Sequence, residues 1–212
     1  MSVTPASTRR RGRPPKFREE VLDTRELLLR TGLEVLTEKG FSATGLDEIL
    51  GRARVPKGSF YHYFDSKEVF GLELVDRYAE YFARKLDSHF GNQELAPLAR
   101  LDAFVADAMA GMARFDFRRG CLIGNLGQEM GSLPESFRAR LAAVFLDWEA
   151  RLAACLDAAK GSGQISNDAD SEQLATAFWI GWEGAVLRAK LERSELPLAT
   201  FARFFVSRLP AT

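Results

Sequence analysis

The sequence leaves room for only a short helix between Pro56 and Asp65. Pro56 has a fixed φ and no backbone N–H, so it suits the first position of a helix. Asp65 and Glu68 have the spacing of a capping box, which predicts that another helix begins with Asp65 as its N-cap. The apolar residues between these two marks lie three and four apart and are expected to point inward: Phe60, Tyr63 and Phe64.

The outer face of this short helix carries side chains that suit the grooves of DNA. Lysine offers a cation, the hydroxyl and ring groups offer donors for phosphates and base edges, and glycine lets the backbone approach closely. An ordinary surface helix would explain the same residues equally well, so the preceding segment decides between the two interpretations. The residues concerned are Lys57, Gly58, Ser59, Tyr61 and His62.

Two further helices are predicted directly upstream. One covers about residues 24–39, where Asp23 and Glu26 have capping-box spacing. The other covers about residues 45–53, with Thr44 as its N-cap. Because only a tight turn separates this second helix from the short one, the pair is predicted to form a helix-turn-helix, and the first helix completes its small core.

This region resembles the DNA-binding signature of the TetR family of repressors, over roughly residues 24–70. Arg54-Val55-Pro56 departs from the Gly-Val-Ser that is more usual in the family, which changes the turn and adds a charge. The resemblance implies that Thr44, Tyr63 and Lys67 hold phosphates of operator DNA, while the five outer residues of the short helix face the major groove. The matching segments are Phe41-Ser42-Ala43-Thr44, Asp47-Glu48-Ile49-Leu50, Ala53, Val55, Lys57 to Phe64 and Ser66-Lys67.

Residues 1–20 are predicted to form a flexible, arginine-rich arm, because they contain prolines and glycine and show no apolar periodicity. Arg11 and Arg13 lie in an Arg-Gly-Arg-Pro sequence that is typical of arms entering a narrow minor groove. A solubilising tail is the alternative. The predicted organisation is therefore an arm over 1–20, a helix-turn-helix domain over 21–67, and a ligand-sensing and dimerisation domain over 68–212.

The charge of the chain is unevenly placed although its net value is zero. Residues 1–70 hold 13 Lys and Arg against 10 Asp and Glu, and residues 71–212 hold 16 against 19, so the basic part is the one with the candidate DNA helix. Two cysteines are too few for a disulfide scaffold and fit a cytoplasmic protein. No long apolar run predicts a membrane span, and no secretory signal is expected at the N-terminus.

The rest of the chain is predicted to be helical, because no stretch alternates with a period of two residues. The fold class is therefore all-α, with a three-helix DNA-binding domain followed by a larger helical domain. Three glycines between residues 118 and 130 predict that this segment is short, kinked or closely packed. The expected helices run from after Asp65 to about Phe90, from Pro97 to about Arg114, from the Ser132/Glu135 capping box to about Lys160, over 171–193 and over 197–208.

The 171–193 helix is predicted to have an apolar surface too wide for a helix with one side in water. A subunit interface would explain this width, and a palindromic operator favours a homodimer with two-fold symmetry. A helix that is fully buried within one chain is the alternative. The two neighbouring stripes are Trp179, Glu183, Val186 and Lys190, and Leu174, Phe178, Trp182, Ala185 and Ala189; the small residues that would allow close approach are Gly181, Gly184, Ala185 and Ala189.

A narrower resemblance covers nearly the whole chain. The segments Arg118 to Met130, Ala177 to Ala185 and Leu187 to Lys190 resemble TetR-family regulators of acrylate utilisation and repressors that respond to N-ethylmaleimide. The resemblance implies a repressor released by a small unsaturated carboxylate or electrophile such as acrylate, and it implies that Cys121 and Lys190 act together. The predicted ligand-binding residues are Arg118, Cys121, Asn125, Glu129, Trp179, Trp182, Glu183 and Lys190.

The chemistry behind this hypothesis is that a thiolate attacks activated alkenes and that a neighbouring ammonium lowers the pKa of a thiol. Lys190 beside Cys121 would do this and would also pair with a carboxylate ligand. A small buried hydrophobic residue is the alternative interpretation of Cys121, and Cys155 is interpreted as core. Neither a cofactor nor a metal is expected.

Two other classes of function were weighed against a ligand-released repressor. A cysteine enzyme needs a base near Cys121, yet the two histidines are His62, in the DNA helix, and His89, at a helix end. An architectural DNA-binding protein would leave the large C-terminal domain without a role. The sequence therefore predicts a dimeric transcriptional repressor and no enzyme.

Overall fold

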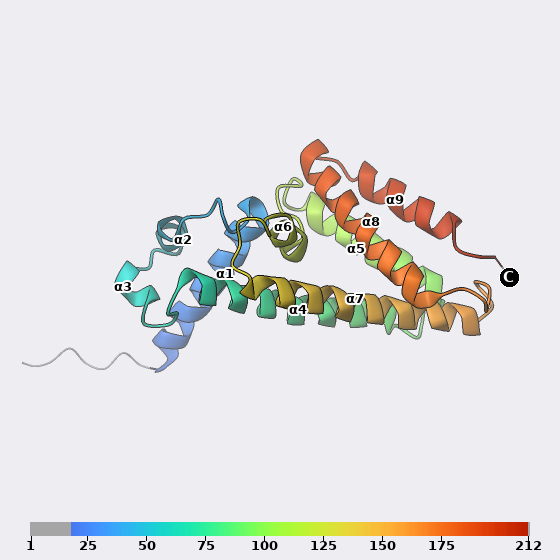
Figure 1. Cartoon of the computed structure of the whole chain (residues 1–212), viewed down its shortest axis with the longest axis horizontal. Helices are drawn as coiled ribbons and strands as arrows, with labels where there is room; N and C mark the ends of the chain where they lie inside the picture. Colours follow the sequence, from blue (N-terminus) through green and yellow to red (C-terminus); the bar gives the residue numbers. More distant parts are fainter. Residues whose placement is uncertain (1–17, 212) are drawn as a thin grey trace, which may run out of the picture.

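The computed structural model describes residues 18–211, and this part of the chain is helical without strands. The short helices α2 and α3 lie at one end, the long helices α4 and α7 run side by side along the molecule, and α8 and α9 lie towards the other end (Figure 1). The helices are α1 (Arg18–Lys39), α2 (Leu46–Ala53), α3 (Lys57–Phe60), α4 (Lys67–Phe90), α5 (Pro97–Ala113), α6 (Leu122–Gln128), α7 (Ser136–Gly161), α8 (Ser171–Glu192) and α9 (Leu196–Ser207).

The all-α prediction is thus confirmed, and most helix ends lie within a few residues of the expected ones. The first helix is longer than expected: α1 begins at Arg18, so Asp23 lies inside it and the predicted cap there is wrong. Arg11 and Arg13, with most of the predicted arm, lie outside the described residues. The membrane prediction agrees with the helices of residues 18–211, none of which is long and apolar enough to span a bilayer.

The caps predicted for α4 and α2 are also wrong. The side chain of Ser66, not Asp65, caps α4 by accepting a hydrogen bond from the backbone N–H of Val69 at 3.1 Å. Gly45 is the N-cap of α2, because the Thr44 hydroxyl is buried and donates to the carbonyl of Gly40 at 2.7 Å.

The capping box predicted at Ser132 and Glu135 does not form either. Helix α7 begins at Ser136, and Glu135 caps it without a side-chain hydrogen bond. The Ser136 hydroxyl instead donates to Glu68 of α4 at 2.6 Å, so the start of α7 is fixed by a contact with a distant part of the chain.

A small aromatic core holds the helix-turn-helix against the start of α4. Phe60 is fully buried, and its ring centroid lies 5.4 Å from that of Phe70. Phe64 packs between them, 4.8 Å from Phe70. The turn between α2 and α3 contains Arg54 with φ +55°, the left-handed conformation that glycine adopts at least cost, which accounts physically for the family's more usual glycine at this place.

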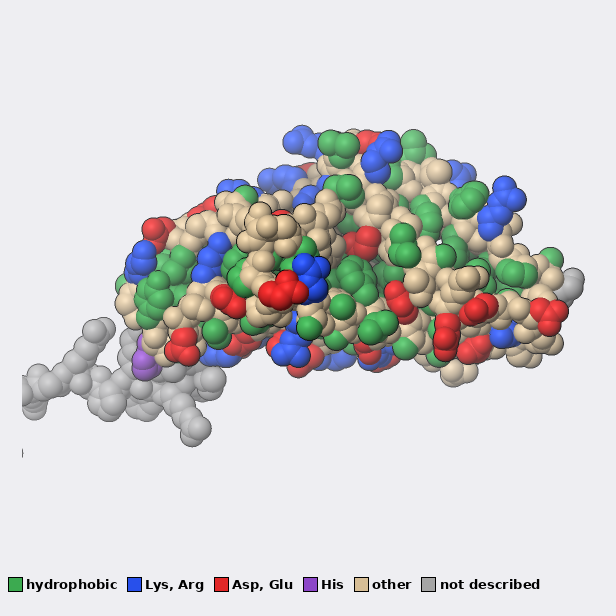
Figure 2. All heavy atoms as spheres, viewed as in Figure 1, with side chains coloured by type: hydrophobic (Ala, Val, Ile, Leu, Met, Phe, Trp, Pro, Cys, Tyr) green, Lys and Arg blue, Asp and Glu red, His purple; other side chains and the backbone are tan. Residues whose placement is uncertain are grey.

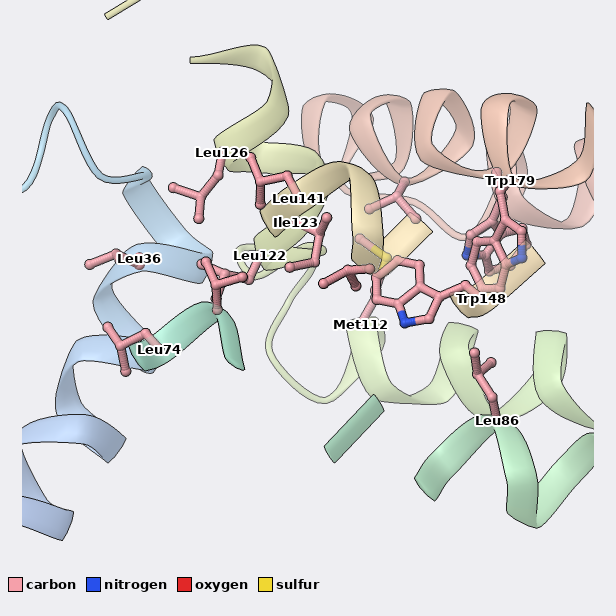
Figure 3. Packing of buried hydrophobic residues seen from close by; sticks show 14 of the residues in the cluster. Leu36, Leu74, Leu86, Met112, Leu122, Ile123, Leu126, Leu141, Trp148 and Trp179 are labelled. Atoms are coloured by element: carbon pink, nitrogen blue, oxygen red, sulfur yellow. The ribbon is translucent and has the colours of Figure 1, made fainter. Parts of the chain in front are cut away.

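A second aromatic core lies in the C-terminal half, where α8 packs on α7 and α9. Trp148 and Trp179 lie beside one another there, with ring centroids 5.0 Å apart (Figure 3). Between the two cores, α6 contributes Leu122, Ile123 and Leu126, all fully buried. Helix α6 is therefore packed into the body of the protein along its apolar side, in agreement with the prediction of a short, closely packed segment.

The two predicted stripes of α8 are largely covered by the chain's own helices, which corrects their assignment to a subunit interface. Phe178, Trp182 and Ala189 are buried, and the ring of Phe201 from α9 lies against Gly181. The predicted alternative, burial within one chain, therefore explains these stripes. Another apolar face of α8 is exposed, and it consists of Ile180, Leu187 and Leu191.

Candidate DNA-binding surface and effector cavity

The exposed side of α3 carries the residues predicted to face the major groove. Pro56 precedes α3 as its N-cap, one position earlier than expected. Lys57, Gly58 and His62 are exposed, Ser59 is half-buried, and Tyr61 is 54% exposed. These groups are accessible because Phe60 and Phe64 point into the core, as predicted.

Lys57 is a cation of this surface whose ion pair within the protein is weak enough to be exchanged for one with DNA. Its Nζ lies 3.2 Å from Oδ1 of Asp47, and both side chains are mostly exposed. An exposed pair of this kind contributes little free energy, so a DNA phosphate can replace the carboxylate at small cost.

The three residues predicted to hold phosphates are placed differently from one another. Tyr63 is half-buried, and its ring packs edge-on against His62 with centroids 5.2 Å apart. Thr44 is almost fully buried, so its hydroxyl is not presented to a phosphate. The ammonium of Lys67 donates to the carbonyl of Phe41 at 2.7 Å, which directs it to the turn between α1 and α2.

The charged side chains show no large patch of one sign on the face drawn in Figure 2, where Lys and Arg are interspersed with Asp and Glu. This agrees with the net charge of zero.

A cavity of about 340 Å³ lies between α1, α4, α5, α6 and α8. Its walls are mainly apolar and aromatic, with a small number of polar groups, which is the usual composition of a small-molecule site. The lining residues are Arg30, Leu33, Glu34, Thr37, Tyr78, Tyr81, Phe82, Lys85, Ala108, Gly111, Met112, Phe115, Arg119, Gly120, Cys121, Trp182, Glu183 and Val186.

Three polar groups from three helices meet in this cavity. Cys121, Tyr78 and Glu183 all line it, and the charge of Glu183 acts on the Cys121 thiol. Cys121 is also the N-cap of α6, and its Sγ accepts from the backbone N–H of Gly124 at 3.4 Å. The Glu183 carboxyl fits there because residue 124 has no Cβ, which would lie 1.8 Å from Oε2 of Glu183.

Burial favours the neutral forms of all three groups. It raises the pKa of Tyr78 and of Cys121 well above their ordinary values, and the charge of Glu183 raises the Cys121 pKa further. Burial also raises the pKa of Glu183 to about 7. Below that pH the cavity therefore presents a phenol, a thiol and a carboxylic acid, each able to donate a hydrogen bond.

Cationic groups line another part of the cavity. The guanidinium of Arg119 lies over the ring of Phe115 at 4.1 Å and forms an ion pair with Glu38 at 3.3 Å. Lys85 Nζ lies 2.8 Å from Oδ2 of Asp107 on α5. The site thus combines neutral donors with two paired cations, a set that suits a small anion or a polar carbonyl compound.

The structure places the predicted ligand-binding residues in three different surroundings. The cavity brings together Cys121, Trp182 and Glu183. Trp179 belongs to the aromatic core, and Arg118 is exposed, 3.9 Å from Asp116.

The other three predicted residues contact the end of α1 or the turn that follows it. Asn125 donates to the carbonyl of Thr37 at 3.0 Å, and Lys190 donates to the carbonyls of Thr37 and Glu38 at 3.3 Å each. The carboxylate of Glu129 accepts from the backbone of the turn.

The predicted pairing of Lys190 with Cys121 is not found, and the expectation of a lowered thiol pKa is wrong for this structure. The Lys190 ammonium is bound to α1 carbonyls, and burial lowers its own pKa. Cys121 faces Glu183 instead, an acid that opposes ionisation of the thiol. Cys155 is buried, as predicted, and its Sγ donates to the carbonyl of Pro97 at 3.4 Å.

Sequence reasoning missed Tyr78 and Arg119 as cavity residues. Tyr78 has helical spacing with Leu74 and Phe82, a pattern that is typical of the buried face of a helix. The signal that distinguishes it is a polar tip within an apolar stripe, because a buried tyrosine hydroxyl needs a partner. Arg119 differs from its neighbour Arg118 only through the fold, since no local pattern tells which of the two turns inward.

Comparison with known proteins agrees with this architecture. The family described as "Bacterial regulatory proteins, tetR family" matches residues 28–74, and the one described as "Tetracyclin repressor-like, C-terminal domain" matches residues 97–205. The chain is 56% identical to the transcriptional regulator AcuR of Cereibacter sphaeroides over 203 residues, which cover 94% of this chain and 92% of AcuR. It is 33% identical to the repressor NemR of Escherichia coli (strain K12) over 176 residues, covering 83% of this chain and 88% of NemR.

A solved structure extends the likeness to three dimensions. The crystal structure of a regulatory protein TetR from Rhodobacter sphaeroides has a TM-score of 0.86 and 56% sequence identity, covering 88% of this chain and 98% of that one. These relatives are regulators and not enzymes. The chain belongs to the TetR family of DNA-binding transcriptional repressors.

Proposed function

We propose that this repressor is released from its operator when a small unsaturated carboxylate such as acrylate enters the cavity. The observation that carries the proposal is the meeting of Tyr78, Cys121 and Glu183 in an otherwise apolar space of about 340 Å³. Residues 21–67 would bind the operator, and residues 68–212 would bind the second subunit and, together with α1, the effector. The resemblance of the sequence to regulators of acrylate utilisation favours an effector of this kind.

The donor set suits a carboxylate or carbonyl acceptor. A phenol, a thiol and a protonated carboxyl can each donate to an oxygen atom of the ligand, while the rings of Phe82 and Trp182 provide apolar walls for the alkene. Because Glu183 titrates near neutral pH, binding of an anion would be accompanied by uptake of a proton at this residue.

The same thiol carries the second candidate function, covalent sensing of electrophiles. Cys121 lines the cavity, so a bound alkene would lie within its reach. The raised pKa of the thiol works against this route, because the thiolate is the nucleophile. Reversible binding is therefore the favoured mode, and covalent modification needs a state in which Glu183 no longer faces the thiol.

We further propose that the repressor acts as a homodimer through the exposed apolar face of α8 and α9. Ile180, Leu187 and Leu191 on α8 and Leu196 and Phe204 on α9 are exposed in the single chain, and the two helices pack together. Exposed apolar side chains gathered on two neighbouring helices favour burial against a second copy. Two α3 helices would then enter successive major grooves, roughly 34–36 Å apart.

The effector proposal is tested by fluorescence anisotropy with a palindromic duplex from the region next to its own gene. Acrylate is expected to weaken operator binding, and propionate, which lacks the alkene, serves as the matched ligand. A Cys121→Ser variant separates the two modes: retained release by acrylate supports reversible binding, and lost release with a mass increase of one acrylate on the wild-type protein supports the covalent route. Operator binding that ignores acrylate in the wild-type protein would refute the proposal.

The dimer proposal is tested by sedimentation of a Leu191→Glu variant. A monomer with weakened operator binding is expected, because a charge would be buried at the proposed contact. A dimer as stable as the wild type would assign the interface to another surface. Glu172→Lys, on an exposed part of the same helix, is the control for a change of charge alone.

A further inference from the structure

Helix α6 connects the cavity with the DNA-binding end of the molecule. It has seven residues and is therefore about 10 Å long. Its N-cap, Cys121, lines the cavity, and its C-cap is Glu129. Figure 3 shows the buried α6 residues Ile123 and Leu126 within the packed interior, so the helix is held as one piece.

The Glu129 carboxylate binds the turn between α1 and α2. Its Oε1 accepts from the backbone N–H of Phe41 at 3.0 Å, and its Oε2 accepts from the N–H of Ser42 at 2.6 Å. Hydrogen bonds to an ionised acceptor are about twice as strong as neutral ones. Two bonds from one carboxylate fix the position and direction of the turn relative to α6.

Gly40 provides the space for this carboxylate. A Cβ at residue 40 would lie 1.7 Å from Oε1 of Glu129, and the φ of +84° is a conformation that other residues rarely adopt. The turn is thus shaped to accept the Glu129 side chain.

The peptide group that joins Phe41 to Ser42 is held at both of its polar ends. Its N–H donates to Glu129, and its carbonyl accepts from Nζ of Lys67 on α4 at 2.7 Å. The same ammonium lies 4.1 Å from the centre of the Phe41 ring, and Glu129 attracts it electrostatically. Opposite charges from α6 and α4 therefore orient one peptide at the entrance to α2.

The remaining contacts between α6 and the DNA-binding end have a different target. Asn125 donates to the carbonyls of Leu36 and Thr37, which lie in the last turn of α1 and also accept backbone N–H groups. These bonds hold α6 to the end of α1 and do not reach the turn that follows it. Among the described α6 residues, including its caps, Glu129 is the one that hydrogen-bonds the turn leading into α2.

We propose that Glu129 is the positioning residue through which occupation of the cavity changes the orientation of α2 and α3. A ligand that displaces Cys121 at one end of α6 would move the carboxylate at the other end, and the peptide after Phe41 would follow it. The inference rests on the proposed function for its effector, but the contact itself also sets operator affinity when no effector is present.

The test compares Glu129→Gln with Glu135→Gln, which removes a nearby carboxylate that is exposed and that, within residues 18–211, forms its ion pair with Arg138. Operator affinity is measured by anisotropy with and without acrylate, and acrylate binding to the DNA-free proteins by calorimetry. Without acrylate, Glu129→Gln is expected to bind the operator at least fivefold more weakly than wild type, and acrylate should then weaken it at least fivefold less than it weakens wild type. Acrylate affinity should stay within twofold, and Glu135→Gln should match the wild type throughout.

A second measurement needs no variant. In the wild-type protein, acrylate is expected to speed hydrogen exchange at the amides of Phe41 and Ser42. Unchanged exchange there during operator release, or a Glu129→Gln protein with wild-type operator affinity and acrylate response, would overturn the inference. If acrylate does not bind the wild-type protein, the effector assignment fails instead, and the operator affinity of Glu129→Gln against Glu135→Gln still decides the role of Glu129.

Discussion

The DNA-binding surface and the effector cavity are built in opposite ways. The surface comes from one continuous stretch, residues 56–64, in which Phe60 and Phe64 point inward while Lys57, Tyr61 and His62 are exposed. The cavity draws its residues from four helices and from the segment that leads into α6. The surface is therefore encoded locally, whereas the cavity exists only once distant segments have packed. Substitutions in the surface and in the cavity should therefore have different effects.

The largest expected effect comes from removing the aromatic support behind the DNA-binding surface. Phe60→Ala should lower the free energy of unfolding by about 3–5 kcal/mol, because a fully buried ring leaves a cavity among Phe64 and Phe70. Urea denaturation measures the loss. Tyr61→Ala, the neighbouring ring on the exposed side, should change stability by less than about 0.5 kcal/mol. Equal losses in the two variants would contradict the division into an inner and an outer face.

The next effect concerns the buried acid of the cavity. The pKa of Glu183 is about 7 in the folded protein, against an ordinary value of 4.5, so the folded state binds its proton more tightly. The stability that this proton provides is present at low pH and is lost as the pH rises from about 4.5 through about 7. Glu183→Gln should thus be more stable than wild type at pH 8, by at most about 3 kcal/mol, and no more stable at pH 4.

Thermal unfolding over this pH range measures the difference between the two proteins. A constant offset at every pH would mean that Glu183 does not titrate differently in the folded state. Glu172→Gln, an exposed acid on the same helix, is the control and should follow the wild type.

The third prediction returns to the outer surface. Lys57→Ala should weaken operator binding about tenfold and reduce the slope of log affinity against log salt by about one, because one phosphate contact is lost. Anisotropy titrations at several salt concentrations give both values. Arg84→Ala removes an exposed cation from α4 and should leave the slope unchanged. The same loss in both variants would show that net charge, and not the position of Lys57, determines binding.

The smallest effect is expected from two adjacent arginines that only the fold distinguishes. Arg119 lines the cavity, so Arg119→Ala should weaken acrylate binding about fivefold, the order of a partly screened charge interaction. Arg118 is exposed and outside it, so Arg118→Ala should bind acrylate like the wild type. Calorimetry distinguishes the two, and the reverse order would place the ligand in a different site.

The sequence predicted the helical architecture and the two faces of the short DNA helix because both depend on spacing along one segment. At the start of α7 the predicted cap failed because a distant contact fixes this helix end: the Ser136 hydroxyl binds Glu68. The effector site was predicted only in part. The sequence predicts Cys121 and Glu183 as ligand-binding residues, and both line the cavity. It does not distinguish Tyr78 from a core residue, and it pairs Lys190 with the thiol although Lys190 binds the end of α1. Such choices depend on helix packing, which periodicity does not encode.

Two glycines seat the two carboxylates that flank α6: Gly124 beneath Glu183 and Gly40 beneath Glu129. Neither glycine carries a side chain that could touch DNA or effector. A genetic screen for repressor variants that no longer respond to the effector should nevertheless recover substitutions at both glycines. Even the methyl group of alanine at either position would displace the carboxylate that packs against it.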